Sequence, residues 1–238
     1  MLRKDEPAVK EVEVAHESPA TSTTSKEAAE HGRVGFWKPA IALVLAAGVG
    51  VFAYENGLDE RVEMKNLSRV EQGLWRSGQF SQFMVGPSLN YVDPDLIVSL
   101  SVDNPENPDN MAEYAAARAA GIERVHVSLK GDGTGDPDEY VEAIVYAIEA
   151  RRADRTVLVH CSAGSERTGG FVALWRTLVN GESVNEGIAQ ELRRHGHDLE
   201  EGVLVDYLND NVAFIADGLV ERGYLAERPD PLPHFRTE

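Results

Sequence analysis

The stretch that decides the fold is residues 160–169, which read His160-Cys161-Ser162-Ala163-Gly164-Ser165-Glu166-Arg167-Thr168-Gly169. It holds the only cysteine of the 238-residue chain, and an arginine follows that cysteine six positions later. A largely apolar run, residues 156–159, leads into the stretch, and a helical pattern leaves it. The sequence therefore predicts a strand, a tight loop and the start of a helix. We call residues 160–169 the cysteine loop.

A strand, a tight loop and a helix N-terminus together form an anion site, because the backbone N–H groups there have no partner inside the helix. Such a site favours the thiolate form of a cysteine. The guanidinium of Arg167 can bind two phosphate oxygens at once. The pattern thus predicts a phosphate site with Cys161 as its nucleophile. The alternative is a buried Cys161 acting as a small hydrophobe, followed by an unrelated arginine.

The order His-Cys-x5-Arg-Thr-Gly resembles the signature loop of the cysteine-dependent protein tyrosine and dual-specificity phosphatases. Upstream, Gly73-Leu74-Trp75-Arg76-Ser77-Gly78-Gln79 is similar to the segment that opens the sheet of many small dual-specificity phosphatases. The resemblance covers about residues 66–180. It implies hydrolysis of phosphomonoesters through a phosphocysteine intermediate, with no cofactor and no metal.

The resemblance also assigns roles within the cysteine loop. Cys161 is the nucleophile, and Arg167 with the loop's backbone N–H groups binds the phosphoryl oxygens. Thr168 either stabilises the departing thiolate or caps the helix, and His160 is a supporting residue. The phosphate-binding residues between the cysteine and the arginine are Ser162, Ala163, Gly164, Ser165 and Glu166.

The acid that protonates the leaving group is expected on a loop beside the pocket. Asp132, within the glycine-rich segment 130–135, and Asp136 are the candidates. Asp136 is already suited to cap a helix whose first residue is Pro137, so Asp132 is preferred. Its distance of 29 residues before Cys161 also matches the family's spacing of about thirty (161 − 132 = 29).

The substrate is expected to be a phosphorylated protein, carrying phosphotyrosine and extending to phosphoserine or phosphothreonine. Glu166 departs from the glycine-rich or basic loops of many relatives, and the loop has no lysine, which disfavours polyanionic lipids. A phosphoinositide phosphatase and a catalytically silent phospho-binding module are the alternatives. A rhodanese-type sulfurtransferase is opposed by the His before the Cys and by the Arg-Thr-Gly ending.

Composition excludes other classes of protein. The net charge of −17 opposes nucleic-acid binding, which needs a basic surface. One cysteine allows no intramolecular disulfide and no cysteine-built zinc site. The seven histidines show no ligand spacing.

The N-terminal third is expected to lie outside the catalytic domain. Residues 1–33 are polar enough to predict a disordered tail. Residues 34–54 predict a transmembrane anchor of 21 residues, near the about 20 that a span needs. A buried core helix or a cleaved signal peptide are the alternatives. The anchor would make this a single-pass membrane protein, its catalytic side leaning towards the periplasm.

Residues 61–222 are expected to form the phosphatase domain, followed by a loose C-terminal tail at 223–238. Strands near 96–100, 124–129 and 156–159 alternate with helices near 110–120 and 137–151. This order predicts an α/β fold with a mainly parallel central sheet flanked by helices on both faces. The cysteine loop would then lie at the carboxyl end of a central strand, the usual place for an α/β site. Further helices are expected at 183–195 and 203–217.

Overall fold

The structure is a computed structural model, and it describes residues 63–184, 189, 192–196 and 202–236. The described residues belong to one compact unit of the chain. The predicted disordered tail (residues 1–33) and the predicted anchor (34–54) lie outside them.

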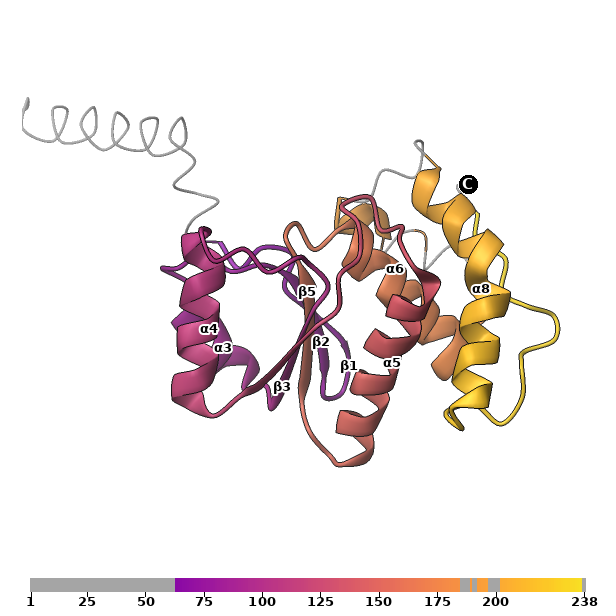
Figure 1. Cartoon of the computed structure of the whole chain (residues 1–238), viewed down its shortest axis with the longest axis horizontal. Coiled ribbons are helices and arrows are strands. Elements are labelled where there is room, and N and C mark those ends of the chain that lie inside the picture. The colour runs from indigo at the N-terminus through magenta and orange to yellow at the C-terminus, as the bar shows by residue number, and fades with distance from the viewer. Residues whose placement is uncertain (1–62, 185–188, 190–191, 197–201, 237–238) are drawn as a thin grey trace, which may run out of the picture. The chain divides into compact units, whose positions relative to one another are not determined.

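A five-stranded sheet runs through the described part of the chain, with the order β1-β2-β5-β3-β4 (Figure 1). β1 pairs antiparallel with β2, and the other three pairings are parallel. The predicted mainly parallel sheet is therefore confirmed, and β5 is its central strand. The strands are β1 (Ser68–Glu71), β2 (Leu74–Gly78), β3 (Leu96–Ser99), β4 (Glu123–His126) and β5 (Val157–Cys161).

Helices cover both faces of the sheet, as predicted (Figure 1). α3 and α4 pack on one face, and α5, α6 and α8 pack on the other. The helices are α3 (Val85–Val92), α4 (Pro108–Ala120), α5 (Pro137–Arg152), α6 (Glu166–Leu174), the π-helical turn η1 (Trp175–Val179) and α8 (Val203–Glu221).

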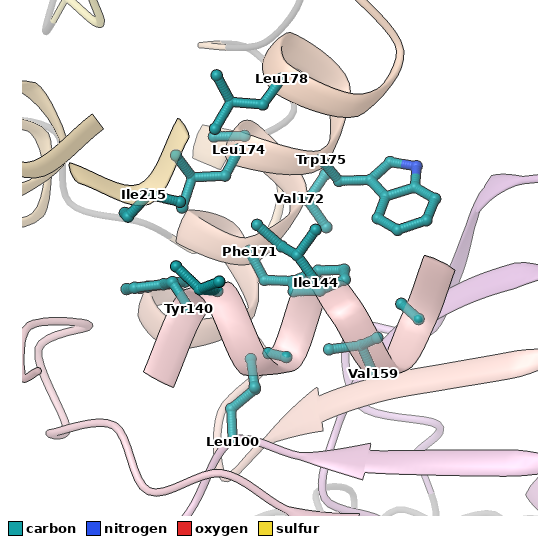
Figure 2. Packing of buried hydrophobic residues seen from close by; sticks show 14 of the residues in the cluster. Leu100, Tyr140, Ile144, Val159, Phe171, Val172, Leu174, Trp175, Leu178 and Ile215 are labelled. Atoms are coloured by element: carbon teal, nitrogen blue, oxygen red, sulfur yellow. The ribbon is translucent and has the colours of Figure 1, made fainter. Parts of the chain in front are cut away.

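The strand β5 is buried on both faces, which explains its continuous apolar sequence. Val157, Val159 and Cys161 point towards α5, α6 and α8, whereas Leu158 joins the cluster under α3 and α4. Figure 2 shows the larger cluster, in which α5 and the helix after the cysteine loop meet. Tyr140, Ile144, Phe171, Leu174 and Ile215 are among its labelled side chains, and all five are fully buried. The cysteine loop thus begins and ends in rigid elements.

The helix α4 begins three residues earlier than its sequence predicted, because the N-cap was expected at Asn110 and lies at Asn107. Asn107 is the N-cap, and its side chain accepts hydrogen bonds from the N–H groups of Asp109 and Asn110 at 2.9 and 3.2 Å. Pro108 is then the first helical residue, where its missing N–H is harmless. Asn110 is buried instead, and its side chain accepts a bond from the Asn104 N–H at 3.0 Å.

The start of α5 follows the prediction. Asp136 caps the helix by accepting the Asp138 N–H at 3.1 Å. The carboxylate of Glu139, in the first turn, accepts the Ser128 N–H at 3.0 Å. That contact ties the helix to the segment after β4.

The prediction of a single-pass membrane location is wrong for the part of the chain that the structure describes. No helix in that part is long and apolar enough to cross a membrane. α8 is the longest with 19 residues, and it carries Asp206, Asp210, Asp217 and Glu221. The predicted span itself lies outside the described residues.

The structure bears on two predictions near the C-terminus, the loose tail and the helix before α8. Residues 223–238 were expected to form a loose tail, yet Phe235 is buried in the core. The side chain of Asn209 bonds both the N–H and the carbonyl of Phe235, at 2.8 and 3.0 Å. The helix expected at 183–195 lies partly outside the described residues, although 189 and 192–194 are helical.

Candidate active site

The cysteine loop leaves the carboxyl end of β5 and enters α6 at Glu166. Cys161 is the last residue of the strand and is 1% exposed. The N–H of Gly164 donates to the Cys161 Sγ atom, with the nitrogen and sulfur 3.1 Å apart. The loop therefore curls around the sulfur, which lies at its floor.

Three successive carbonyl groups of the cysteine loop point away from its centre and accept hydrogen bonds from the segment of residues 66–79. Ser162 accepts from the Gln79 N–H at 3.2 Å, Ala163 from the Asn66 side-chain amide at 2.9 Å, and Gly164 from the Arg76 guanidinium.

The outward carbonyls fix the direction of the loop's N–H groups. In a planar trans peptide the C=O and the next N–H point in opposite directions. With the carbonyls of residues 162–164 held outside, the N–H groups of residues 163–165 point inwards. The bond from the Gly164 N–H to Sγ agrees with this direction. Successive inward N–H groups form a concave anion site.

Two glycines allow the loop to lie against the end of β2. A Cβ atom on Gly164 would lie 2.5 Å from the Gly78 nitrogen, and one on Gly78 would lie 2.7 Å from the Ala163 oxygen. Gly164 also has a φ of +78°, which L side chains rarely adopt. Residues 76–78, the Arg-Ser-Gly part of the segment that opens the sheet, are thus the surface on which the cysteine loop rests.

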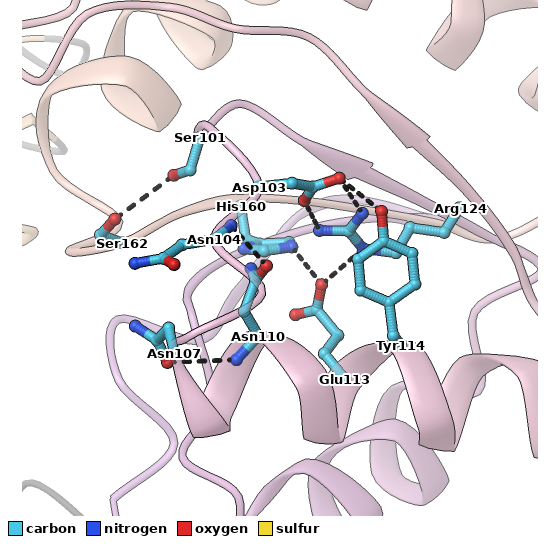
Figure 3. Close-up of polar contacts among 10 residues, drawn as sticks. All are labelled: Ser101, Asp103, Asn104, Asn107, Asn110, Glu113, Tyr114, Arg124, His160 and Ser162. Carbon is cyan, nitrogen blue, oxygen red and sulfur yellow. Dashed lines mark hydrogen bonds and ion pairs between the residues drawn. The ribbon is translucent and has the colours of Figure 1, made fainter.

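Arg167 lies in the first turn of α6, and its Nη2 donates to the Ser162 hydroxyl at 3.2 Å. The guanidinium therefore folds back across the loop towards Ser162. The Ser162 hydroxyl is also 3.4 Å from the Ser101 hydroxyl, which follows β3 (Figure 3). The carboxyl ends of β3 and β5 meet here.

Thr168 is fully buried at the base of the loop. Its hydroxyl has no hydrogen-bond partner within the described residues, so it does not cap α6. The N-cap is Ser165, whose side chain makes no cap bond. Of the two roles left open for Thr168, the capping role is not seen.

His160 points away from the loop, towards α4 and a buried charged cluster (Figure 3). Its Nε2 lies 3.2 Å from Oε1 of Glu113, and each of the two side chains is 2% exposed. Arg124 donates to the same oxygen at 2.8 Å and to Asp103 at 2.7 Å. The strand residue before the nucleophile is thus anchored by charges from α4 and β4, which the sequence did not reveal.

The charges around Glu113 determine its ionisation. Burial raises the pKa of Glu113. His160 and Arg124 together lower it by more than burial raises it, so the net pKa is below the ordinary 4.5. Glu113 is consequently a carboxylate at neutral pH.

Replacing Glu113 by glutamine is expected to lower the free energy of unfolding at pH 7 by about 3 kcal/mol, because Arg124 loses a buried charge partner. The folded pKa lies below 4.5, so the stabilisation is present above that pH. It is lost as the pH falls through the folded pKa. Urea unfolding measured from pH 7 down to pH 3 should show the unfolding free energies of the parent protein and of Glu113→Gln converging. A difference that stays constant with pH would contradict the carboxylate role of Glu113.

The glycine-rich segment 130–135 packs beside the cysteine loop. A Cβ atom on Gly133 would lie 3.3 Å from the carbonyl carbon of Glu166. The buried Tyr140 hydroxyl donates to the Gly133 carbonyl at 2.7 Å. The segment that carries Asp132 is therefore a neighbour of the first turn of α6.

Asp132 has a local role that the sequence did not suggest. Its Oδ1 accepts the Thr134 N–H at 3.0 Å and the Thr134 hydroxyl at 2.7 Å. These bonds lower the pKa of the exposed Asp132 below 3.8. Asp136 is engaged at the cap of α5. No hydrogen bond joins either carboxylate to the cysteine loop in the part of the chain that is described.

A strand, a concave loop around a buried sulfur and an arginine on the following helix define a cysteine-dependent phosphatase. The family model described as "DSP-PTPase phosphatase fused to NAD+ Kinase" matches residues 62–203. The chain belongs to this family, and thus to the cysteine-dependent protein tyrosine phosphatase superfamily that its sequence resembled.

Solved structures show the same fold. The core catalytic domain of Siw14 from S. cerevisiae, named a PP-IP phosphatase, is 21% identical with a TM-score of 0.51; the match covers 71% of this chain and 96% of that one. TpbA of P. aeruginosa is also 21% identical with a TM-score of 0.51, covering 66% and 90%. No curated protein sequence gives a significant match.

Proposed function

We propose that this phosphatase hydrolyses phosphotyrosine, and also phosphoserine or phosphothreonine, of protein substrates through a phosphocysteine intermediate. The observation that carries the proposal is the sulfur of Cys161 at the floor of the loop, with the Gly164 N–H 3.1 Å from it. A phosphoryl group placed over that sulfur meets the inward N–H groups of residues 163–165. We further propose that residues 61–222 form the catalytic domain.

In the first step the Cys161 thiolate attacks phosphorus, and the S–P bond forms as the bond to the leaving oxygen breaks. Negative charge on the three equatorial oxygens is stabilised by the loop N–H groups and by Arg167. In the second step water attacks phosphorus, the S–P bond breaks and the thiolate departs. The buried hydroxyl of Thr168 stabilises that thiolate in this proposal, supported by its lack of any other bond among the described residues.

The preference for protein substrates rests on charge. The cysteine loop has one carboxylate, Glu166, and no lysine, so its charge does not favour a polyanionic ligand. The PP-IP activity named for Siw14 makes a polyphosphorylated substrate the counter-candidate. A panel of phosphopeptides, phosphoinositides and inositol polyphosphates, assayed for phosphate release, separates the two. Fastest turnover is expected on a phosphotyrosine peptide. Faster turnover of a polyphosphate would overturn the preference, and no turnover with intact binding would indicate a silent binding module.

Asp132 is proposed as the acid that protonates the leaving oxygen. Its segment adjoins the first turn of α6, which supports the proposal. Its low pKa opposes protonation while Thr134 holds the carboxylate, so the acid function requires that these two bonds break when substrate binds.

Replacing Asp132 by asparagine is expected to lower kcat/KM for phenyl phosphate by roughly 10²–10³-fold, since a poor leaving group needs a proton. The loss should be smaller for p-nitrophenyl phosphate, whose leaving group is stable as an anion. Asp136→Asn is the matched control, because asparagine is an equally good N-cap. A larger loss in Asp136→Asn than in Asp132→Asn would move the acid to Asp136.

A further inference from the structure

The guanidinium of Arg76 is buried completely beneath the cysteine loop. Arg76 lies on β2, is 0% exposed and is the largest fully buried side chain of the described residues. In the parallel register it pairs with Val159, two residues before Cys161, and so points to the same face of the sheet as the cysteine. Burying a guanidinium is unfavourable by several kcal/mol unless its surroundings compensate.

One hydrogen bond of Arg76 is directed at the loop backbone. Its Nη2 donates to the Gly164 carbonyl. Gly164 has a φ of +78° and no side chain, so the peptide that joins it to Ser165 can rotate more easily than others. Holding this carbonyl outside turns the Ser165 N–H towards the place of the phosphoryl group.

The positive charge of Arg76 acts on its surroundings as well. Burial first, and then the charges of Arg76 and Arg194, lower the pKa of His195 from 6.5 to about 4. His195 lies at the same edge of the loop, because Asn66 donates both to the His195 carbonyl at 3.1 Å and to the Ala163 carbonyl at 2.9 Å. The positive charge beneath the loop therefore contributes to the lowered pKa of His195. The same charge attracts an anion that binds above the loop.

We propose that Arg76 is a positioning residue of the phosphate site. It fixes the Gly164–Ser165 peptide with its N–H aimed at a phosphoryl oxygen, and it supplies a buried positive charge beneath the loop without touching substrate. The inference rests on the proposed function of the cysteine loop.

The test measures binding of inorganic phosphate by calorimetry in full-length Cys161→Ser protein, so that no covalent step contributes. Arg76→Met keeps most of the volume and removes both donor and charge, Arg76→Gln keeps a donor, and Arg76→Lys keeps charge and donor. Arg76→Met is expected to raise the Kd for phosphate at least about tenfold, the equivalent of one charged hydrogen bond. Arg76→Lys should recover most of that loss and Arg76→Gln less. Arg69→Met, on the exposed side of β1, is the control without effect.

A spectroscopic readout separates positioning from general loss of structure. In the Cys161→Ser protein the Ser165 amide resonance should shift when phosphate binds, and in Arg76→Met that shift should be lost while other loop amides still respond. Removing a single buried charged group can lower the stability of the fold. If Arg76→Met does not fold, the test is the comparison of the other two variants. Arg76→Gln is then expected to bind phosphate more weakly than Arg76→Lys, and equal affinities would overturn the role of the charge.

Two failures are distinguishable. If the Cys161→Ser protein binds no phosphate, the proposed function of the loop fails. If it binds phosphate and the Arg76 variants bind within about twofold of it, the role of Arg76 alone is overturned.

Discussion

Replacing Cys161 by serine should abolish hydrolysis of p-nitrophenyl phosphate, with kcat falling by at least about 10⁴-fold, because the attacking thiolate is removed and catalytic groups act as a unit. Binding of phosphate should survive, since the oxygens are bound by loop N–H groups and Arg167. Serine fits the site, because it differs from cysteine by one atom at the floor of the loop. The variant thus separates binding from chemistry.

The measurement is steady-state hydrolysis, with phosphate affinity and melting temperature recorded on the same preparation. A folded Cys161→Ser protein that binds phosphate but does not turn over is the expected outcome. Hydrolysis at the parent rate would eliminate Cys161 as the nucleophile. It would also leave the buried sulfur, with its bond from the Gly164 N–H, as a structural feature only.

Replacing Arg167 by lysine should lower kcat/KM by roughly 10²–10³-fold, as expected for the loss of one donor to the transition-state oxygens. Lysine keeps the positive charge but not the planar fork that binds two oxygens together. Because the charge on the oxygens grows in the transition state, kcat should fall more than phosphate affinity does.

Arg155→Lys is the matched control for Arg167→Lys. Arg155 pairs with Glu123 at 2.7 Å on the surface, and this pair lies at the opposite, amino ends of the parallel strands. Its replacement should leave kcat/KM unchanged. Equal kinetics in Arg167→Lys and the parent would exclude a bidentate role for Arg167.

The cysteine loop could be predicted because its chemistry and its geometry lie within ten consecutive residues. Strand, loop and helix follow one another there, so local pattern was sufficient. The mainly parallel character of the sheet also followed from the alternation of strands and helices, since parallel strands need crossovers. The start of α4 was misplaced by three residues because two asparagines compete for the cap, and Pro108 favours the first of them.

The support of the loop could not be predicted, because it comes from distant segments. Asn66 lies 97 residues from the carbonyl that it holds, and Arg76 lies 88 residues from Gly164. The ring of His160 meets Glu113, which also binds Arg124, through the packing of α4 on the sheet. Asn66 has a φ of +51°, a conformation set by its surroundings, which no sequence pattern indicated.

The most direct test of the account is to trap the intermediate. The protein is mixed with p-nitrophenyl phosphate, quenched within one turnover and digested, and the phosphorylated peptide is located by mass spectrometry. Phosphate on Cys161 is the predicted result. Turnover without a phosphoenzyme, or phosphate on any other residue, would contradict it.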